Sequence, residues 1–133
     1  MRDHVRLQTS ILLRRFAYEV GHAAKSGNAE AIHDLRVAIR RLSNCLRLFA
    51  QFYPRHSAKR IRQRLDSLME LAGALRNLDL TLELLAQAGV SPRSALAVRL
   101  RDERRKTSHG LTREMRRWKN RGFSRKWRSR LDL

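Results

Sequence analysis

The sequence lacks the disulfide-forming cysteines of many secreted proteins and the long apolar runs of membrane proteins. It has one cysteine, so no disulfide can form within the chain, and a reducing compartment fits. That residue, Cys45, lies toward the apolar side of its segment, which favours a buried, inert thiol over a nucleophile. No run approaches the roughly 18 apolar residues of a membrane-spanning helix, and the N-terminal MRDHVRLQTS lacks the apolar core of a signal peptide. We therefore expect a cytoplasmic protein.

Helix breakers and strand formers are also scarce. The chain has two prolines and six glycines, and Val, Ile, Tyr and Phe are few beside Leu, Ala and Arg. No alternating apolar pattern lasts more than a few residues. A length of 133 residues suits one domain with a real core and is too short for two ordinary domains. We predict a single all-α domain over residues 1–133.

Acidic residues are the third shortage. Twelve Asp and Glu stand against 30 Lys and Arg, which gives a formal net charge of +18. Arginine supplies 25 of the 30, and its planar guanidinium suits phosphate and carboxylate oxygens. These numbers favour a polyanionic partner. A merely solvated basic surface is the alternative, although self-repulsion at this charge opposes a compact fold.

Turn-forming residues divide the chain at 25–28, 53–57, 88–93 and 120–122. The segments between them, including 3–24 and 57–88, carry apolar residues at three- and four-residue steps, which is typical of amphipathic helices. The third segment has the clearest stripe, which runs from Ile61 to Leu82 and Leu85. Expected N-caps are Asn28 or Ser26, Ser57 and Ser91, and a short fifth segment starts at Gly122. The expected architecture is an antiparallel four-helix bundle with a short C-terminal helical extension.

The second helix separates apolar from basic residues. Leu35, Leu42 and Leu46 fall on one side. The other side carries a stripe that spans an arc of roughly 80° and a length of about 20 Å. The stripe consists of His33, Arg36, Arg40, Asn44 and Arg47. Like charges so spaced repel by a few tenths of a kcal/mol per pair. Either carboxylates of neighbouring helices or an external polyanion must offset this, and the shortage of acidic residues favours the polyanion. His33 suits equally a helix-start hydrogen bond or a ligand contact.

Two further helices carry candidate cations. Arg62 and Arg76 lie two heptads apart on the third helix, although a local pair of Arg76 with Asp79 is a structural alternative. On the fourth helix a stripe beside the apolar face comprises Arg99, Lys106, Arg113 and Arg117. Side chains at the edge of a core can extend their charged heads into a shared groove.

Two motifs resemble those of a known family. AIHDLRVAIRRLSNCLRLF, residues 31–49, is similar to the signature helix of CHAD domains, which begins H-x-x-R-V-A-x-R-R-L and ends L-R-L-F. GALRNLDLTLELL, residues 73–85, resembles their second signature, G-x-V-R-D-L-D followed by a leucine-rich run. The motifs stand in the family's order, and the resemblance covers nearly the whole chain.

The resemblance implies a helical bundle that binds inorganic polyphosphate without catalysis and without a cofactor. Polyphosphate granules are then a candidate location. The contacts that the resemblance implies are His33, Arg36, Arg40, Arg41, Arg47 and Arg76. Helical geometry adds Arg62, Arg99, Lys106 and Arg113, and leaves Arg41 about 80° from the stripe of the second helix.

The chain also departs from the family's pattern. Ser43 stands where CHAD domains commonly have arginine, and Asn77 where they usually have aspartate. The family's domain has a second helical half with its own basic signature, so the resemblance covers the N-terminal half. We therefore expect a homodimer or association with a missing second half.

Three other functions compete with polyphosphate binding. An enzyme is disfavoured, because the chain has no phosphate-binding glycine loop, E-x-E-x-K motif or metal-spaced Cys and His. Nucleic acid is the main alternative, since arginine stripes suit RNA and DNA backbones equally well. However, aromatic residues make up only 6% of the chain and lie mostly at core spacing, which leaves few for base stacking. A helical interaction module anchored by Trp118, Phe123 and Trp127 is the third.

Overall fold

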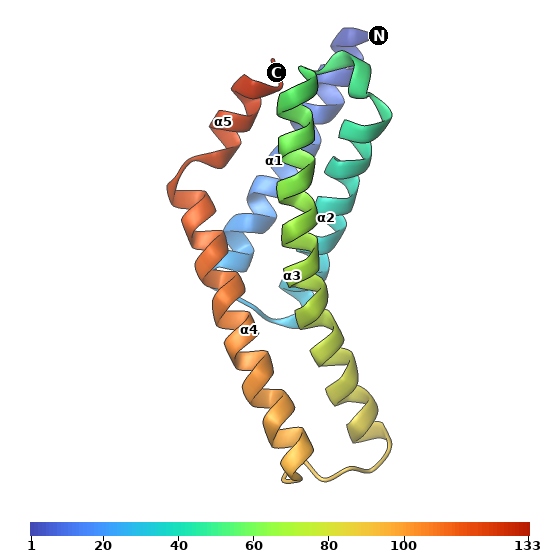
Figure 1. Ribbon diagram of the computed structural model, residues 1–133, viewed down its shortest axis with the longest axis vertical. Coiled ribbons are helices and arrows are strands. Elements are labelled where there is room, and N and C mark those ends of the chain that lie inside the picture. The colour runs from blue at the N-terminus through green and yellow to red at the C-terminus, as the bar shows by residue number, and fades with distance from the viewer.

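The chain folds into five α-helices and no strands in the computed structural model, which describes residues 1–133 (Figure 1). A short 3-10 helix, η1 (Ala50–Phe52), lies between the second and third helices. The α-helices are α1 (Arg2–Lys25), α2 (Ala29–Leu48), α3 (Arg55–Gln87), α4 (Ala95–Asn120) and α5 (Phe123–Arg130). The predicted all-α class is confirmed.

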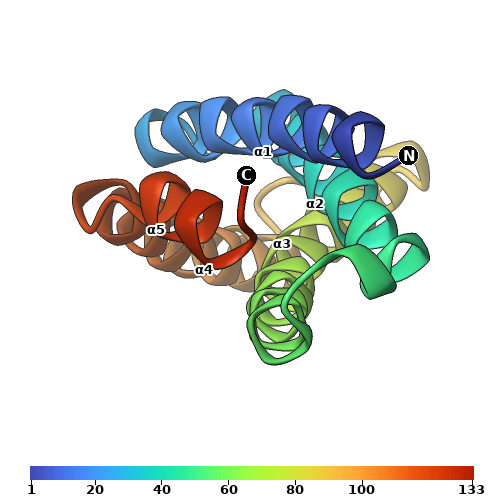
Figure 2. The same cartoon turned by 90° about the horizontal axis from the view of Figure 1, so that it is seen from above.

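The first four helices form a ring. α1 packs against α2 and α4, and α3 packs against the same two helices from the other side. Figure 2, seen along the bundle from above, shows that α2 and α4 lie diagonally across this ring. Helix α5 turns at Gly122, whose φ of 65° is left-handed, and returns to the end of the bundle that holds the N-terminus (Figure 1). This is the expected four-helix bundle with a C-terminal extension.

Helix starts follow side-chain capping in two places. The side-chain oxygen of Asn28 accepts a hydrogen bond from the backbone N–H of Ala31 at 2.8 Å, as predicted for α2. The predicted cap of α4 is wrong, because Ser94 rather than Ser91 accepts the N–H of Ala97, at 3.2 Å. The hydroxyl of Ser91 instead accepts the N–H of Arg93 and closes a turn.

The predicted cap of α3 is also wrong. The helix begins at Arg55, two residues before Ser57, and its N-cap is Pro54 with no side-chain cap. Proline fixes its own φ, here −56°, close to a helical value. The helix therefore starts directly after the proline.

One hydrophobic cluster of 25 buried residues holds the bundle together. Its aromatic part joins α1, α4 and α5: the rings of Phe16 and Trp127 stack at 5.8 Å, and Trp118 and Phe123 meet them edge-on. Trp118, Phe123 and Trp127 are at most 5% exposed. They complete the core, so the hypothesis that they anchor a partner protein is wrong.

The far halves of α3 and α4 project beyond α1 and α2 as a helical hairpin (Figure 1). No residue of α3 after Leu75 is buried. Leu82 and Leu85, which the apolar stripe predicts as core, are only partly buried because the hairpin has no second pair of helices to cover it. Their stripe continues past the end of the four-helix core.

Arg104 joins the base of this hairpin to the rest of the bundle. Its Nε and Nη2 donate to the carboxylate of Asp79 at 2.5 and 3.3 Å, and Nη2 also donates to the carbonyl oxygen of Gly27 at 2.8 Å. Gly27 lies in the turn between α1 and α2. Asp79 therefore pairs across helices with Arg104, and the alternative local pair with Arg76 does not form.

A buried polar cluster links α1, α2 and the loop before α3. The hydroxyl of Thr9 donates to the carbonyl of Val5 at 2.7 Å and lies 2.5 Å from the hydroxyl of Tyr53, so Tyr53 is the donor in that pair. The thiol of Cys45 completes the cluster and is buried, as the sequence predicts.

Burial raises the pKa of Tyr53 well above its ordinary value. The folded chain then keeps this proton at a pH where the unfolded chain has lost it. Stability from this group is therefore full below the ordinary tyrosine pKa of about 10 and declines as the pH rises above it.

Candidate functional site

Three arginines of α2 lie on the edge of the helix that faces α3. The opposite edge of α2 faces α1, because Cys45 contacts Thr9 of α1, and Asp34 and Arg41 line a hollow together with α1 residues. Each of Arg36, Arg40 and Arg47 follows a buried core residue by one position and so lies about 100° around the helix, away from α1.

Two arginines of α3 lie toward α2 by the same helical geometry. The edge of α3 that carries Arg60 and Arg64 lines a cleft with α4. Arg62 and Arg76 lie on the other side of the buried stripe, and α2 is the neighbour on that side. We call the surface formed by Arg36, Arg40, Arg47, Arg62 and Arg76 the α2–α3 face.

Two members of the α2–α3 face are partly embedded. The Nε atoms of Arg36 and Arg62 are buried and have no hydrogen-bond acceptor in the protein. A buried donor without a partner costs about 1–3 kcal/mol. These two guanidinium groups are therefore held in place at a cost to the stability of the unliganded fold.

No member of the α2–α3 face forms an ion pair with a carboxylate. The ion pairs of the structure are Arg15–Glu19, His22–Glu19, Arg104–Asp79, Arg105–Asp102 and Arg117–Glu114. None of them involves the ten predicted contact residues. Within the face, Arg47 donates to the side-chain oxygen of Asn44 at 2.5 Å, which leaves its charge uncompensated.

His33 and Arg41 line a different feature. With Arg15, Glu19 and Asp34 they border a hollow of about 280 Å³ between α1 and α2. The carboxylate of Glu19 is buried there and pairs with Arg15 at 3.3 Å. Arg41 is thus separated from the stripe of α2, in the direction that its helical angle predicts, and His33 stands at the edge between the two surfaces.

The predicted cations of α4 lie apart from the α2–α3 face. Arg99, Lys106 and Arg113 are exposed, and α4 is diagonal to α2 in the ring. The structure therefore brings five of the ten predicted residues together on one face and leaves these three on another.

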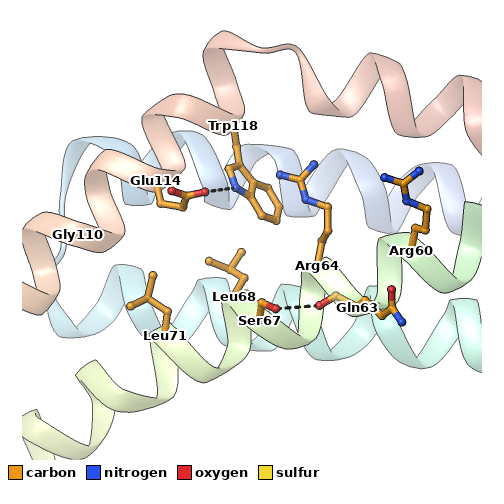
Figure 3. Close-up of a pocket in the computed structure, with 9 residues that line it drawn as sticks. All are labelled: Arg60, Gln63, Arg64, Ser67, Leu68, Leu71, Gly110, Glu114 and Trp118. Atoms are coloured by element: carbon orange, nitrogen blue, oxygen red, sulfur yellow. Dashed lines mark hydrogen bonds between the residues drawn. The ribbon is translucent and has the colours of Figure 1, made fainter.

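A second feature, which the sequence analysis missed, lies between α3 and α4. A cleft of about 550 Å³ is bordered by Arg60, Arg64, Leu68, Leu71, Gly110 and Trp118, among others (Figure 3). The guanidinium carbon of Arg64 lies 4.6 Å from the ring centre of Trp118, and the indole N–H donates to Glu114 at 3.0 Å. One available signal was Gly110, a glycine in the middle of a helix where no turn occurs.

The fold and its unpaired arginines define an all-α bundle with a basic surface of the kind that attracts polyanions. A family model described as CHAD domain matches residues 10–132. The chain belongs to the CHAD domain family, whose members are associated in general with polyphosphate binding. No curated protein and no solved structure matches the chain.

None of the helices is both long and apolar enough to span a membrane. His, Cys, Asp and Glu side chains nowhere gather in a group of three or more that could hold a metal ion.

Proposed function

We propose that this domain binds inorganic polyphosphate on the α2–α3 face, without covalent chemistry. The observation that carries the proposal is the absence of any carboxylate partner for five neighbouring arginines, in a chain of net charge +18. Family membership supports polyphosphate as the class of ligand.

Bound phosphates would relieve the charge repulsion of the unliganded face, whereas the buried Nε atoms of Arg36 and Arg62 stay out of their reach. Phosphate oxygens offset the mutual repulsion of the guanidinium groups and supply acceptors for the rest of each guanidinium. Each charge-assisted hydrogen bond contributes about 1.5–3 kcal/mol before desolvation and ordering are subtracted. Because the contacts lie along two helices, affinity should rise with phosphate chain length, and short phosphates should bind weakly.

Two variants that lose the same number of charges test where polyphosphate binds. The triple variant Arg36→Gln, Arg40→Gln, Arg47→Gln removes three charges from the α2–α3 face. The control Arg99→Gln, Lys106→Gln, Arg113→Gln removes three charges from α4 and leaves that face intact. We expect the first variant to lose at least tenfold in affinity for long-chain polyphosphate by isothermal titration calorimetry, and the control to lose much less. Equal losses would show that net charge, and not this face, determines binding.

Nucleic acid is the second candidate, because its backbone offers the same phosphate oxygens. The α2–α3 face has no aromatic member, and Phe16, Phe123 and Trp127 are buried in the core. This favours polyphosphate, since no ring of that face is available to stack on bases. A competition titration of long-chain polyphosphate against RNA and duplex DNA, at two salt concentrations, separates the two. RNA that displaces polyphosphate at physiological salt would overturn the assignment.

We further propose that the bound form is a homodimer, or a complex with a second helical half. Two copies related by a twofold axis would place two α2–α3 faces on one polyphosphate chain. Light scattering after size exclusion, with and without polyphosphate, tests this: a mass that stays at 15.6 kDa plus ligand would refute the dimer.

A further inference from the structure

We propose that the cleft between α3 and α4 is a second binding site, selective for a nucleoside triphosphate. It lies on the opposite edge of α3 from the α2–α3 face, so the two sites are separate. Its residues differ from those of the polyphosphate proposal, and each proposal can fail without the other.

One end of the cleft is a mainly apolar chamber, which the carboxylate of Glu114 also borders. Leu68 and Leu71 of α3 face Trp118 of α4 across it, and Gly110 adds no side chain to the α4 wall (Figure 3). The indole is held in position, because its N–H donates to Glu114 at 3.0 Å. A volume of about 550 Å³ falls within the range of ordinary small-molecule sites, roughly 300–1,000 Å³. The chamber can therefore receive a flat organic body such as a nucleobase.

The other end of the cleft is basic. Arg60 and Arg64 line the cleft and also a neighbouring hollow of about 160 Å³, so the two cavities adjoin. His56 and Arg130 line the same hollow. None of these four side chains forms an ion pair with a carboxylate. Three arginines and a histidine around so small a space favour a ligand with several negative charges.

The pairing of these two ends determines the class of ligand. A bare phosphate chain would satisfy the arginines and leave the chamber empty, whereas an uncharged aromatic molecule would leave the arginines unpaired. An anion with a single charge would use one guanidinium. A nucleoside triphosphate has a planar base and a compact group of three to four charges, and it matches both ends. Polar groups for the base edge are at hand in Gln63 and Ser67, which line the cleft.

Calorimetry with three probes tests the proposal on the whole chain. We expect ATP, in magnesium-free buffer, to bind at least tenfold more tightly than either inorganic tripolyphosphate or adenosine, because only ATP occupies both ends. Binding of ATP no tighter than that of tripolyphosphate would overturn the proposal, since the base would then contribute nothing.

Gly110→Phe would add a ring to the α4 wall of the chamber. A Cβ at this position would meet no atom within 4 Å, and a helix interior favours other residues over glycine by up to about 1 kcal/mol. We expect Gly110→Phe to reduce ATP affinity at least tenfold and to leave tripolyphosphate affinity unchanged, while Gly110→Ala retains ATP binding. Unchanged ATP affinity in Gly110→Phe would exclude the chamber as the base site.

The α2–α3 variant provides the independent control. Arg36→Gln, Arg40→Gln, Arg47→Gln should keep its affinity for ATP while losing affinity for polyphosphate. Loss of ATP binding in this variant would place ATP on the α2–α3 face and overturn the second site. Loss of neither ligand would refute only the polyphosphate proposal.

Discussion

Replacing the two embedded arginines of the α2–α3 face should stabilise the unliganded protein and weaken its binding of polyphosphate. The Nε atoms of Arg36 and Arg62 are buried without an acceptor, a state that costs about 1–3 kcal/mol for each donor. Methionine keeps a straight apolar stem of similar length and has no donor. It also removes one positive charge from a chain of net charge +18.

We expect each of Arg36→Met and Arg62→Met to raise the free energy of unfolding by about 1 kcal/mol, the lower end of that range, because some packing of the stem is lost. For a domain of this size, 1 kcal/mol shifts the melting temperature by about 3–6 °C. Urea and thermal unfolding, followed by circular dichroism, measure both quantities. The double variant should lose at least tenfold in polyphosphate affinity by calorimetry.

The matched control is Arg125→Met, which removes the same charge from an exposed position on α5. Its free energy of unfolding should change by no more than about 0.5 kcal/mol. If the double variant is less stable than the native chain, the embedded Nε atoms do not destabilise the fold. Arg36 and Arg62 would then carry no structural cost in the unliganded protein.

Three other predictions concern stability. Tyr53→Phe should lower the free energy of unfolding by about 0.5–1.5 kcal/mol at neutral pH. Above pH 10 the free energy of unfolding should fall less steeply in this variant than in the native chain, because Tyr53 contributes a slope of up to about 1.4 kcal/mol per pH unit. Parallel curves of the two proteins in urea titrations at rising pH would contradict this. Asp79→Ala should cost about 1–3 kcal/mol, because Arg104 loses its carboxylate; an unchanged urea midpoint would show that the pair adds nothing. Trp127→Ala, at a side chain 1% exposed, should lower the free energy of unfolding by about 3–5 kcal/mol. It should also detach α5 from the bundle, which would be measured as faster amide hydrogen exchange in Phe123–Arg130. A loss under about 1 kcal/mol would show that α5 adds little to stability.

Helical periodicity predicted the bundle well because it depends on local spacing alone. The first segment, expected over 3–24, is the helix Arg2–Lys25, and the fifth, expected from Gly122, begins one residue later at Phe123. Two caps were predicted wrongly. At α3 the helix starts directly after Pro54 without a side-chain cap, and at α4 the neighbouring serine serves. Ser91 and Ser94 both precede α4, and only the extended backbone of Ser94, with ψ of 150°, lets its hydroxyl reach the N–H of Ala97.

The composition of the candidate site was harder to predict. A helical angle shows which residues of one helix share a face, and it correctly set Arg41 apart from Arg36 and Arg40. It does not show which neighbouring helix that face meets, because this depends on how the four helices are arranged in the ring. Arg99 and Lys106 were therefore expected in a groove shared with α2, although α4 lies diagonally opposite it.

The cleft between α3 and α4 was missed for a related reason. Arg60 and Arg64 stand four residues apart on α3, on the opposite edge from Arg62, and in the sequence they resemble an ordinary solvated pair. Only the position of Trp118 and the open space beside Gly110 turn that edge into a cavity. Such a cavity forms between helices and leaves no periodic pattern in either of them.

The helical hairpin formed by the far halves of α3 and α4 should unfold locally at a lower free energy than the four-helix core. Between residues 76 and 110, Ala97 is the single buried residue, so little hydrophobic free energy opposes separation of the two helices of the hairpin. The tip of the hairpin, near Gly89, should unfold and refold locally many times while the aromatic part of the core stays folded. Excising a few turns from this tip should therefore shorten the protein with almost no loss of thermal resistance.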